Sequence, residues 1–367
     1  MRFRYSRGKD GKTEKKAVVY TKDEHNIDVR DVDTDAAYVC SRLRGQSYET
    51  YIVGGAVRDL MLGNKPKDFD IATAASPAQI KKIFRNSRII GRRFRLVHVF
   101  FGNKIYELAT FRSIKDGATG NTFGTIEEDV LRRDFSLNAL FYDPEQELVI
   151  DYIGGVEDIR KRIIHPIIPL EIIFKDDPVR MIRAVKYAAM TGFEIPLKLH
   201  NRIKAEANLL ETISPSRLTE EIVKIINSTC PAEIVRALDS YGLYRYLQPN
   251  AARMMEKNPE FKERYMKSLM TLTRTPAGEK DSALRALIVD YVEANTDWTG
   301  LMPELFRKTF FSARKFVMPM SPQRMELGKA LRQIFAEHGI TVKKIRPLRS
   351  RGRDIYEDKA GAGLSPT

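Results

Sequence analysis

A short segment near the N-terminus combines residue types that suit phosphate and metal chemistry. Residues 53–73 read VGGAVRDLMLGNKPKDFDIAT, with the step Gly54-Gly55 and the pair Asp68 and Asp70. In a strand, residues two apart point to the same side, so we expect both aspartates on one face. Two such carboxylates repel unless a cation lies between them, and Mg²⁺ prefers oxygen ligands shared with substrate phosphates. Taken alone, a D-x-D pair is also typical of a solvated strand edge or turn.

The two glycines add a second feature. They precede a predicted helix over residues 56–62, where free backbone N–H groups and the helix dipole favour a phosphate. Their missing side chains let a phosphate approach the backbone, and Arg58 could add a charge-assisted hydrogen bond. An ordinary tight turn is the alternative. Together with the aspartates, however, the glycines predict a nucleotidyl-transfer site that uses two Mg²⁺ ions.

A third carboxylate is expected from a neighbouring strand. Glu107 lies within KIYELATF (104–111), on the face that it would share with Ile105 and Ala109. A charged residue in this apolar run is costly without a partner. A glutamate that faces water on an edge strand is the alternative, but the position after the D-x-D strand favours a metal ligand.

The surrounding pattern predicts a mixed head followed by helices. Strands are expected at 48–53, 68–72, 95–101, 104–111 and 147–155, and helices at 33–43, 56–62 and from Ser76-Pro77. Gly102-Asn103 predicts a tight hairpin turn, and residues 113–125 a mobile loop. After Gly155, helical periods dominate to about residue 340.

Composition narrows the function classes. The 367 residues allow two or three domains, and 62 Lys and Arg against 48 Asp and Glu give a net charge of +14. That excess favours an anionic partner, either nucleic acid or a membrane surface, over a merely well-solvated protein. Two distant cysteines, Cys40 and Cys230, argue against a disulfide framework and a Cys-rich metal site. With no secretory signal and no apolar run long enough for a bilayer, we expect a soluble, cytoplasmic protein without membrane contact.

Four motifs, taken in order, resemble a known family. VGGAVRDLMLG…KDFDIAT, ELATFR, RRDFSLNAL and DDPVRMIRAV are similar to those of the class II nucleotidyltransferases, which include bacterial poly(A) polymerases and tRNA CCA-adding enzymes. The resemblance implies an α+β protein with a polymerase-β-like nucleotidyltransferase head and all-α neck and body domains. It implies the catalytic residues Asp68, Asp70, Glu107 and Asp134, of which the first three bind metal. It also implies a nucleotide site formed by Gly54, Gly55, Arg58, Arg112, Arg133, Asp134, Asn138, Asp177, Arg180 and Arg183.

The motif DDPVRMIRAV (176–185) also has a local interpretation. Asp177 can cap a helix whose first turn contains Pro178, and Arg180, Arg183 and Tyr187 share a face apart from an apolar stripe. A solvated basic face is the alternative. By resemblance, Asp177 and Arg180 read the incoming base. The family usually has Glu where this chain has Asp176.

The segment FRNSRIIGRRFRLVHVFFG (84–102) resembles the poly(A) polymerases more than the CCA-adding enzymes. Between Lys81 and Arg95 there are seven basic residues and no acidic one. A solvated basic face is the alternative to RNA binding by Lys81, Lys82, Arg92, Arg93 and Arg95.

The resulting prediction is an enzyme that transfers AMP from ATP to RNA 3′ ends, so its expected partners are RNA and ATP. A CCA- or A-adding enzyme acting on tRNA and an inactive RNA-binding homologue are the alternatives. The expected divisions are a flexible basic arm (1–30), the head (31–160), the neck (161–230), the body (231–340) and a basic tail (341–367).

Overall fold

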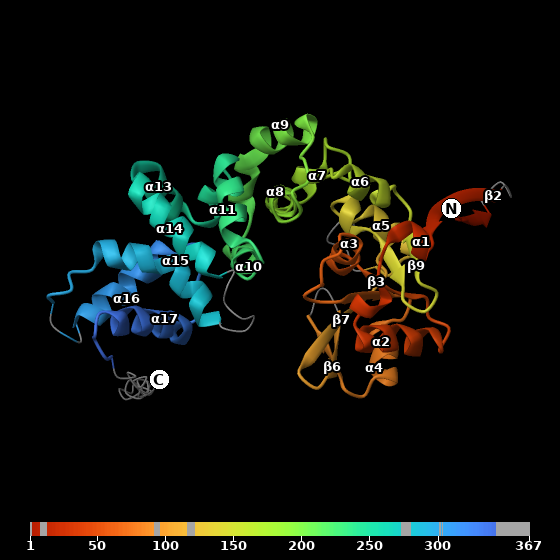
Figure 1. Cartoon of the computed structure of the whole chain (residues 1–367), viewed down its shortest axis with the longest axis horizontal. Helices are drawn as coiled ribbons and strands as arrows, with labels where there is room; N and C mark the ends of the chain where they lie inside the picture. The colour runs from red at the N-terminus through yellow and green to blue at the C-terminus, as the bar shows by residue number, and fades with distance from the viewer. Residues whose placement is uncertain are drawn as a thin grey trace, which may run out of the picture.

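The computed structural model describes residues 2–7, 13–91, 96–115, 122–272, 280–300, 302 and 304–342. The molecule is elongated, with a head of mixed strands and helices at one end and a helical part that extends from it (Figure 1). Within the described residues, no helix is both long and apolar enough to cross a membrane.

A nine-stranded sheet forms the centre of the head, in the order β1-β2-β9-β8-β3-β4-β7-β6-β5. Strands β3 and β4 pair antiparallel, whereas β4 and β7 run parallel. The predicted hairpin is confirmed, because β6 and β7 are joined at Gly102, whose φ of 54° lies in the left-handed region. The strands are β1 (Arg2–Arg7), β2 (Thr13–Tyr20), β3 (Thr50–Val53), β4 (Asp70–Thr73), β5 (Ser87–Ile90), β6 (Leu96–Phe101), β7 (Lys104–Thr110), β8 (Phe141–Asp143) and β9 (Leu148–Asp151).

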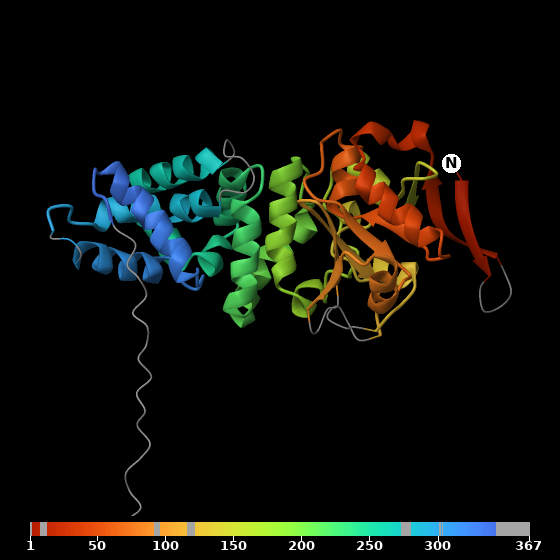
Figure 2. The same ribbon diagram turned by 90° about the horizontal axis from the view of Figure 1, so that it is seen from below.

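The N-terminal segment corrects one prediction. The prediction of a flexible arm over residues 1–30 is wrong for the described residues, because β1 and β2 form a hairpin and β2 pairs with β9. Figure 2 shows this hairpin at the outer end of the head. Ala17 and Tyr20 are buried, and Arg4 donates hydrogen bonds to Glu49 and to the Tyr51 hydroxyl, both at 2.9 Å. The apolar end of β2 therefore anchors a segment whose basic composition had indicated disorder.

The two faces of the sheet are covered differently. Helices α2 (Thr34–Arg44) and α4 (Pro77–Ile83) pack on one face, over buried residues that include Ile71 and Leu108. Helix α2 is capped by Asp33, and α4 begins with a capping box from Ser76. On the other face, a smaller core beneath α5 (Ile126–Leu131) covers β3, β8 and β9. Residues of β4 and β7 that alternate with Ile71 and Leu108 therefore face this second side.

Helices follow the head, as predicted from the change in periodicity after Gly155. Tyr244 and Tyr265 are fully buried in this part, and their hydroxyl groups are 2.8 Å apart. The helices are α6 (Gly155–Lys161), α7 (Ile173–Asp176), α8 (Val179–Thr191), α9 (Leu197–Glu206), α10 (Pro215–Ile226), α11 (Pro231–Ser240), α12 (Tyr244–Leu247), α13 (Pro249–Lys257), α14 (Pro259–Thr271), α15 (Lys280–Asn295), α16 (Glu304–Phe316) and α17 (Arg324–Glu337). The boundaries between head, neck and body stay predictions, and the basic residues 343–353 lie outside the described part.

Candidate active site

Two of the predicted carboxylates lie directly opposite each other on neighbouring strands. Asp70, the first residue of β4, pairs with Glu107 of the parallel strand β7. Both side chains are exposed, whereas Phe69 and Ile71 are buried on the other side of the backbone. Asp68 is also exposed but precedes the strand instead of lying in it. The predicted alternation is therefore correct, although β4 begins two residues later than expected.

The carboxylates influence one another electrostatically. The pKa of Asp70 is raised to about 6. The larger cause is the surrounding protein, which reduces the hydration of the carboxylate, and the negative charges of Glu107 and Asp68 add to it. Arg133 and Lys224 oppose this shift. A bound divalent cation would relieve this repulsion, so the donor chemistry fits Mg²⁺. Among the described residues, however, no three His, Cys, Asp or Glu side chains already form a group that could hold a metal ion.

Glu107 has a neighbour that the sequence did not suggest. His98 Nε2 of β6 lies 3.5 Å from Glu107 Oε2, because the two residues are paired across β6 and β7. The imidazole therefore contacts the carboxylate that was predicted to be the third metal ligand. A cation held jointly by the three acids would require Glu107 to share its oxygens between His98 and the ion.

The glycine step adjoins the aspartates. Gly54 has φ 72° and immediately precedes helix α3 (Gly55–Met61). A Cβ atom at Gly54 would lie 3.8 Å from Asp70 Oδ2, so the turn lies directly against this carboxylate. The structure thus brings together the two features of residues 53–73 on which the prediction of nucleotidyl transfer depended.

The predicted phosphate contact of Arg58 stays a prediction, and its guanidinium lies beside the glycine step, with Nη2 3.4 Å from the place of a Cβ atom at Gly55. Its side chain is buried, with Nη1 2.7 Å from Asn138 Oδ1 and Nε 2.8 Å from Asp59 Oδ1. The guanidinium also lies 5.6 Å from the ring centre of Tyr187 on α8. Arg58 therefore ties α3 to Asn138 and to the first long helix beyond the head.

A group of arginines lies beside these acids. Arg133 donates to Asp129 at 2.8 Å and to the Asn138 carbonyl at 3.0 Å. Burial, with a contribution from nearby guanidinium groups, lowers the pKa of both Arg112 and Arg132, and that of Arg132 is lowered to about 10. This concentration of guanidinium groups suits a polyanion such as a triphosphate. Sequence reasoning omitted Arg132, although the doubled arginine of RRDFSLNAL was a usable signal.

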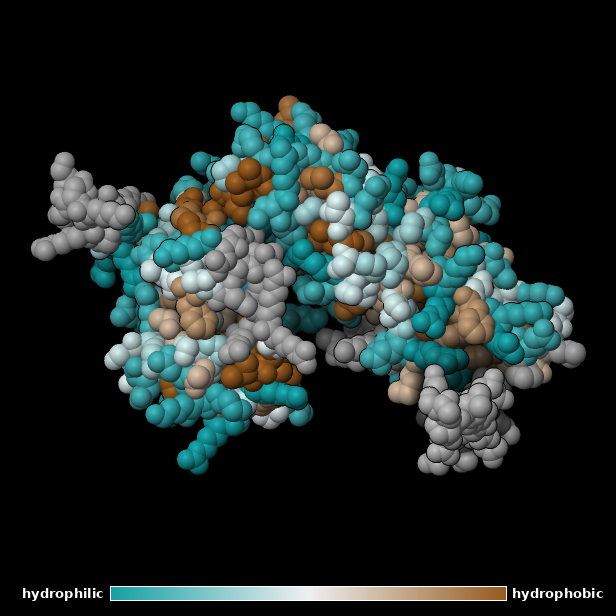
Figure 3. Space-filling model, turned by 180° about the vertical axis from the view of Figure 1, so that it is seen from behind, coloured by the Kyte–Doolittle hydropathy of each residue, from teal (hydrophilic) through white to brown (hydrophobic). Residues whose placement is uncertain are grey.

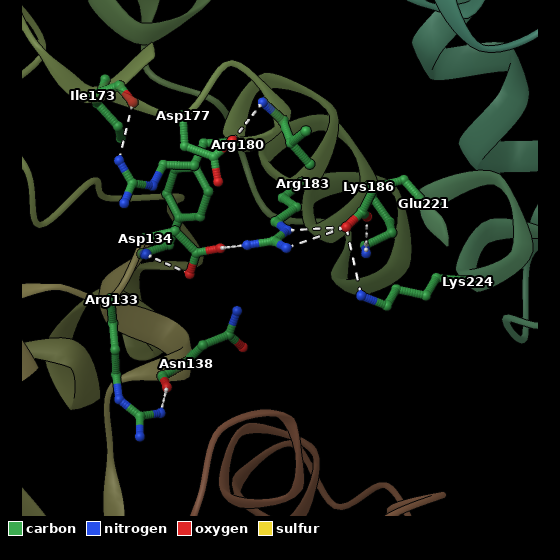
Figure 4. A network of polar contacts seen from close by, with 12 residues as sticks. Arg133, Asp134, Asn138, Ile173, Asp177, Arg180, Arg183, Lys186, Glu221 and Lys224 are labelled. Atoms are coloured by element: carbon green, nitrogen blue, oxygen red, sulfur yellow. Dashed lines mark hydrogen bonds and ion pairs between the residues drawn. The ribbon is translucent and has the colours of Figure 1, made fainter. Parts of the chain in front are cut away.

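An ion-pair network joins the head to the helices (Figure 4). Asp134 of the head lies 3.8 Å from Arg183 of α8, which is 3.2 Å from Glu221 of α10. Lys186 and Lys224 approach the same glutamate at 3.2 Å and 3.6 Å. Burial would raise the pKa of Glu221, but these three cations outweigh it and lower that pKa. Glu221 and Lys224 were not predicted, because their roles depend on the packing of α10 against α8.

The proposed base-reading residues occupy the beginning of α8. Asp177 is buried, accepts a hydrogen bond from the Val179 N–H at 3.2 Å and pairs with Arg217 at 2.8 Å. Arg180 is also buried, and its Nη1 lies 3.1 Å from the Ile173 carbonyl and 2.5 Å from Asp176 Oδ2. Asp176 is thus the ionic partner of Arg180. Both predicted base-reading side chains are fixed by neighbours, as a selective site requires.

The predicted RNA-binding residues are only partly accounted for. Lys81 and Lys82 are exposed on α4, and Lys81 donates a hydrogen bond of 3.5 Å to the Ser87 carbonyl. Helix α4 covers the face of the sheet opposite to the carboxylates, so these two lysines are not gathered at the site. Arg92, Arg93 and Arg95 lie outside the described residues.

Comparison with known proteins agrees with this geometry. A family model described as "Poly A polymerase head domain" matches residues 50–165, and one described as "Probable RNA and SrmB- binding site of polymerase A" matches residues 192–255. Poly(A) polymerase I of Salmonella typhi is 41% identical over 256 residues, which are 65% of this chain and 55% of that protein. Over these residues the chain is similar to bacterial poly(A) polymerases.

CCA-adding enzymes are similar to this chain as well. The CCA-adding enzyme of Geobacillus thermodenitrificans is 38% identical over 215 residues, 57% of this chain and 53% of that protein. The chain thus spans little more than half the length of these curated relatives. The crystal structure of the Bacillus stearothermophilus CCA-adding enzyme in complex with CTP superposes with a TM-score of 0.57 at 26% identity, covering 83% of this chain and 82% of that one. The predicted α+β fold is confirmed, and so is the predicted resemblance to poly(A) polymerases and CCA-adding enzymes.

Proposed function

We propose that this protein transfers AMP from ATP to the 3′ end of RNA. The observation that carries the proposal is the pairing of Asp70 with Glu107 beside the Gly54 turn. This arrangement places carboxylate oxygens, which can bind a metal ion, next to a glycine turn that leaves room for a phosphate. The basic side chains of Arg133 and Lys224 act on the same carboxylate, which adds the positive charge that a triphosphate requires.

The reaction joins the RNA 3′ oxygen to the α-phosphorus of ATP and breaks the bond from that phosphorus to the pyrophosphate oxygen. Asp68, Asp70 and Glu107 would hold Mg²⁺, which when bound favours loss of the 3′-hydroxyl proton and offsets charge on the phosphates. The residues of this chain have three further roles: Arg133 lies where it can bind phosphates, Gly54 and Gly55 leave room for them, and Asp177 with Arg180 binds the base.

The choice of poly(A) addition over CCA addition rests on the relatives. Poly(A) polymerase I of Salmonella typhi matches a larger share of this chain than the CCA-adding enzyme of Geobacillus thermodenitrificans, 65% against 57%, at slightly higher identity. The solved structure of the Bacillus stearothermophilus CCA-adding enzyme favours the second candidate, a CCA- or A-adding enzyme that acts on tRNA. Either activity agrees with the predicted cytoplasmic location.

A single incorporation assay separates the candidates. The full chain, with Mg²⁺, is given ATP or CTP and either an unstructured RNA or a tRNA that lacks its terminal CCA. We expect long extension of the unstructured RNA with ATP only. Incorporation of CTP that stops after a few residues on the tRNA would establish the alternative. Asp68→Ala is expected to lose incorporation while it retains RNA binding, and normal turnover by this variant would contradict the assignment.

A further inference from the structure

A row of polar residues crosses four strands from the candidate active site to the sheet edge. Asp70 of β4 pairs with Glu107 of β7, Glu107 with His98 of β6, and His98 with Arg88 of β5. Neighbouring strands lie about 4.8 Å apart, so Arg88 is roughly 10 Å from Glu107 along this row. Because the residues are in register, their side chains share one face. The candidate site therefore continues beyond its carboxylates onto a surface that the proposed chemistry does not use.

An apolar pair lies beside this row. Phe100 of β6 is paired with Ile105 of β7, two residues along each strand from His98 and Glu107 and on the same face. Ile105 is 55% exposed and Phe100 is half-buried, whereas Val99 on the other face is fully buried. The rings of His98 and Phe100 have centroids 6.5 Å apart. These side chains form an open platform next to Glu107 that does not belong to the core.

Arg88 supplies a cation at the edge of this platform. Its side chain is exposed, and it has no hydrogen-bond or ion-pair partner among the described residues. Strands β6 and β7 lie in the part of the head nearest the helical body (Figure 1), and Figure 3 shows a hollow between these two parts of the molecule. A flexible anion that reaches this end of the row would therefore meet the exposed Arg88 guanidinium and an apolar surface together.

We propose that this face binds the 3′-terminal nucleoside of the RNA, with its base on Phe100 and Ile105 and its 5′ phosphate at Arg88. The proposal rests on the proposed function, because the 3′ hydroxyl must come to Asp70 and Glu107. A nucleotide fits because every base has an apolar face that stacks on aromatic side chains, and its phosphate matches the cation. A folded protein partner would need about 800 Å² of surface, far more than these two apolar side chains provide.

The test is a binding cycle that needs no catalysis. Binding of the full chain to two fluorescent, unstructured RNAs is measured by anisotropy, one RNA ending in adenosine and the other in an abasic 3′ nucleotide. The variants are Phe100→Ala, Ile105→Ala and Arg88→Gln. Tyr38→Ala and Arg42→Gln serve as matched controls, since both residues are exposed on α2, which covers the opposite face.

Phe100→Ala and Ile105→Ala should weaken binding of the adenosine-ended RNA about tenfold and of the abasic RNA less than twofold. Arg88→Gln should weaken both equally, and the controls neither. The proposal would be overturned if Phe100→Ala and Ile105→Ala weakened binding of both RNAs equally, or if they weakened neither. The second result would mean that this face binds a different partner. If the binding results are as expected but the wild type does not incorporate AMP, the proposed enzymatic activity is wrong while the proposed RNA site stands.

Discussion

Asp134 of the head and Arg183 of helix α8 face each other across the junction between head and helices, 3.8 Å apart. A second contact across this junction is the hydrogen bond of 3.2 Å from Lys67 to the Asn227 carbonyl. Arg183 also pairs with the buried Glu221, so its position is fixed from the helical side. The head, which bears the carboxylates, and α8, which bears the proposed base-reading residue Arg180, are therefore connected through a charged network.

Glu221 is the anion on which this network depends. Glu221→Gln should lower the free energy of unfolding by about 3 kcal/mol, because Lys186 would remain buried without its counter-charge. Glu220→Gln is the matched control, since Glu220 is exposed and pairs with Lys224 at the surface, and it should change stability by less than about 1 kcal/mol. Urea titrations of the three proteins measure both values. Equal stability of the two variants would show that Glu221 is not the anchor of the network.

A comparison of Gly54 with Gly63 tests whether Gly54 is required only for the backbone conformation or also for the reaction. Gly54 and Gly63 have nearly identical positive φ angles, 72° and 71°, but a Cβ atom at Gly63 would meet no atom within 4 Å. Gly63→Ala should therefore lose about 1–2 kcal/mol of stability from backbone strain. Gly54→Ala should lose at least as much, because its ψ of −137° lies outside the left-handed helical region. Gly54→Ala alone should also lose AMP incorporation, by at least tenfold, because its turn adjoins Asp70. Thermal unfolding and incorporation assays test this pair, and equal activities of the two variants would remove Gly54 from the site.

Local sequence pattern was sufficient where a structure depends on neighbours along the chain. The hairpin at Gly102, the helix capped by Ser76 and the alternation of Asp70 with Ile71 are all set by nearby residues, and each was predicted. The third carboxylate at Glu107 was also identified, because a charge that interrupts an apolar strand is visible in the sequence.

Features that depend on tertiary packing were missed. The hydrogen bond from Arg58 to Asn138, eighty residues away, was not predicted. The contact between His98 and Glu107 requires the register of two strands. The hairpin formed by β1 and β2 gains its stability from β9, which lies more than 120 residues later. Composition alone could not show these long-range partners.

Base selection can be tested at Asp177. Asp177→Asn keeps the shape of the side chain but replaces an acceptor oxygen by a donor, so the hydrogen-bond pattern offered to a base changes. We expect the ratio of kcat/KM for ATP to that for CTP to change at least tenfold, with a smaller effect on RNA affinity. Glu171→Gln, an exposed change near the start of α7, is the control and should leave the ratio unaltered. An unaltered ratio for Asp177→Asn would argue against base reading by this residue.

Burial of Asp70, together with repulsion from the neighbouring carboxylates, makes stability depend on pH and on Mg²⁺. The pKa of Asp70 in the folded protein, about 6, lies above its usual 3.8, so the folded state favours the protonated acid. Asp70 therefore costs no stability below about pH 4, an increasing amount as the pH rises to 6, and its full amount above that. Asp70→Asn should raise the Tm of the Mg²⁺-free protein at pH 8 and have little effect at pH 4.5.

The same repulsion predicts the response to Mg²⁺, because a cation bound among Asp68, Asp70 and Glu107 would offset it. At pH 8, Mg²⁺ should raise the Tm of the wild type, and this gain should be much smaller for Asp70→Asn. Asp31→Asn, an exposed change elsewhere in the head, controls for general effects of charge and should respond to Mg²⁺ as the wild type does. A Tm gain that is the same in all three proteins would place the bound Mg²⁺ away from these carboxylates, even if the enzyme requires Mg²⁺ for turnover.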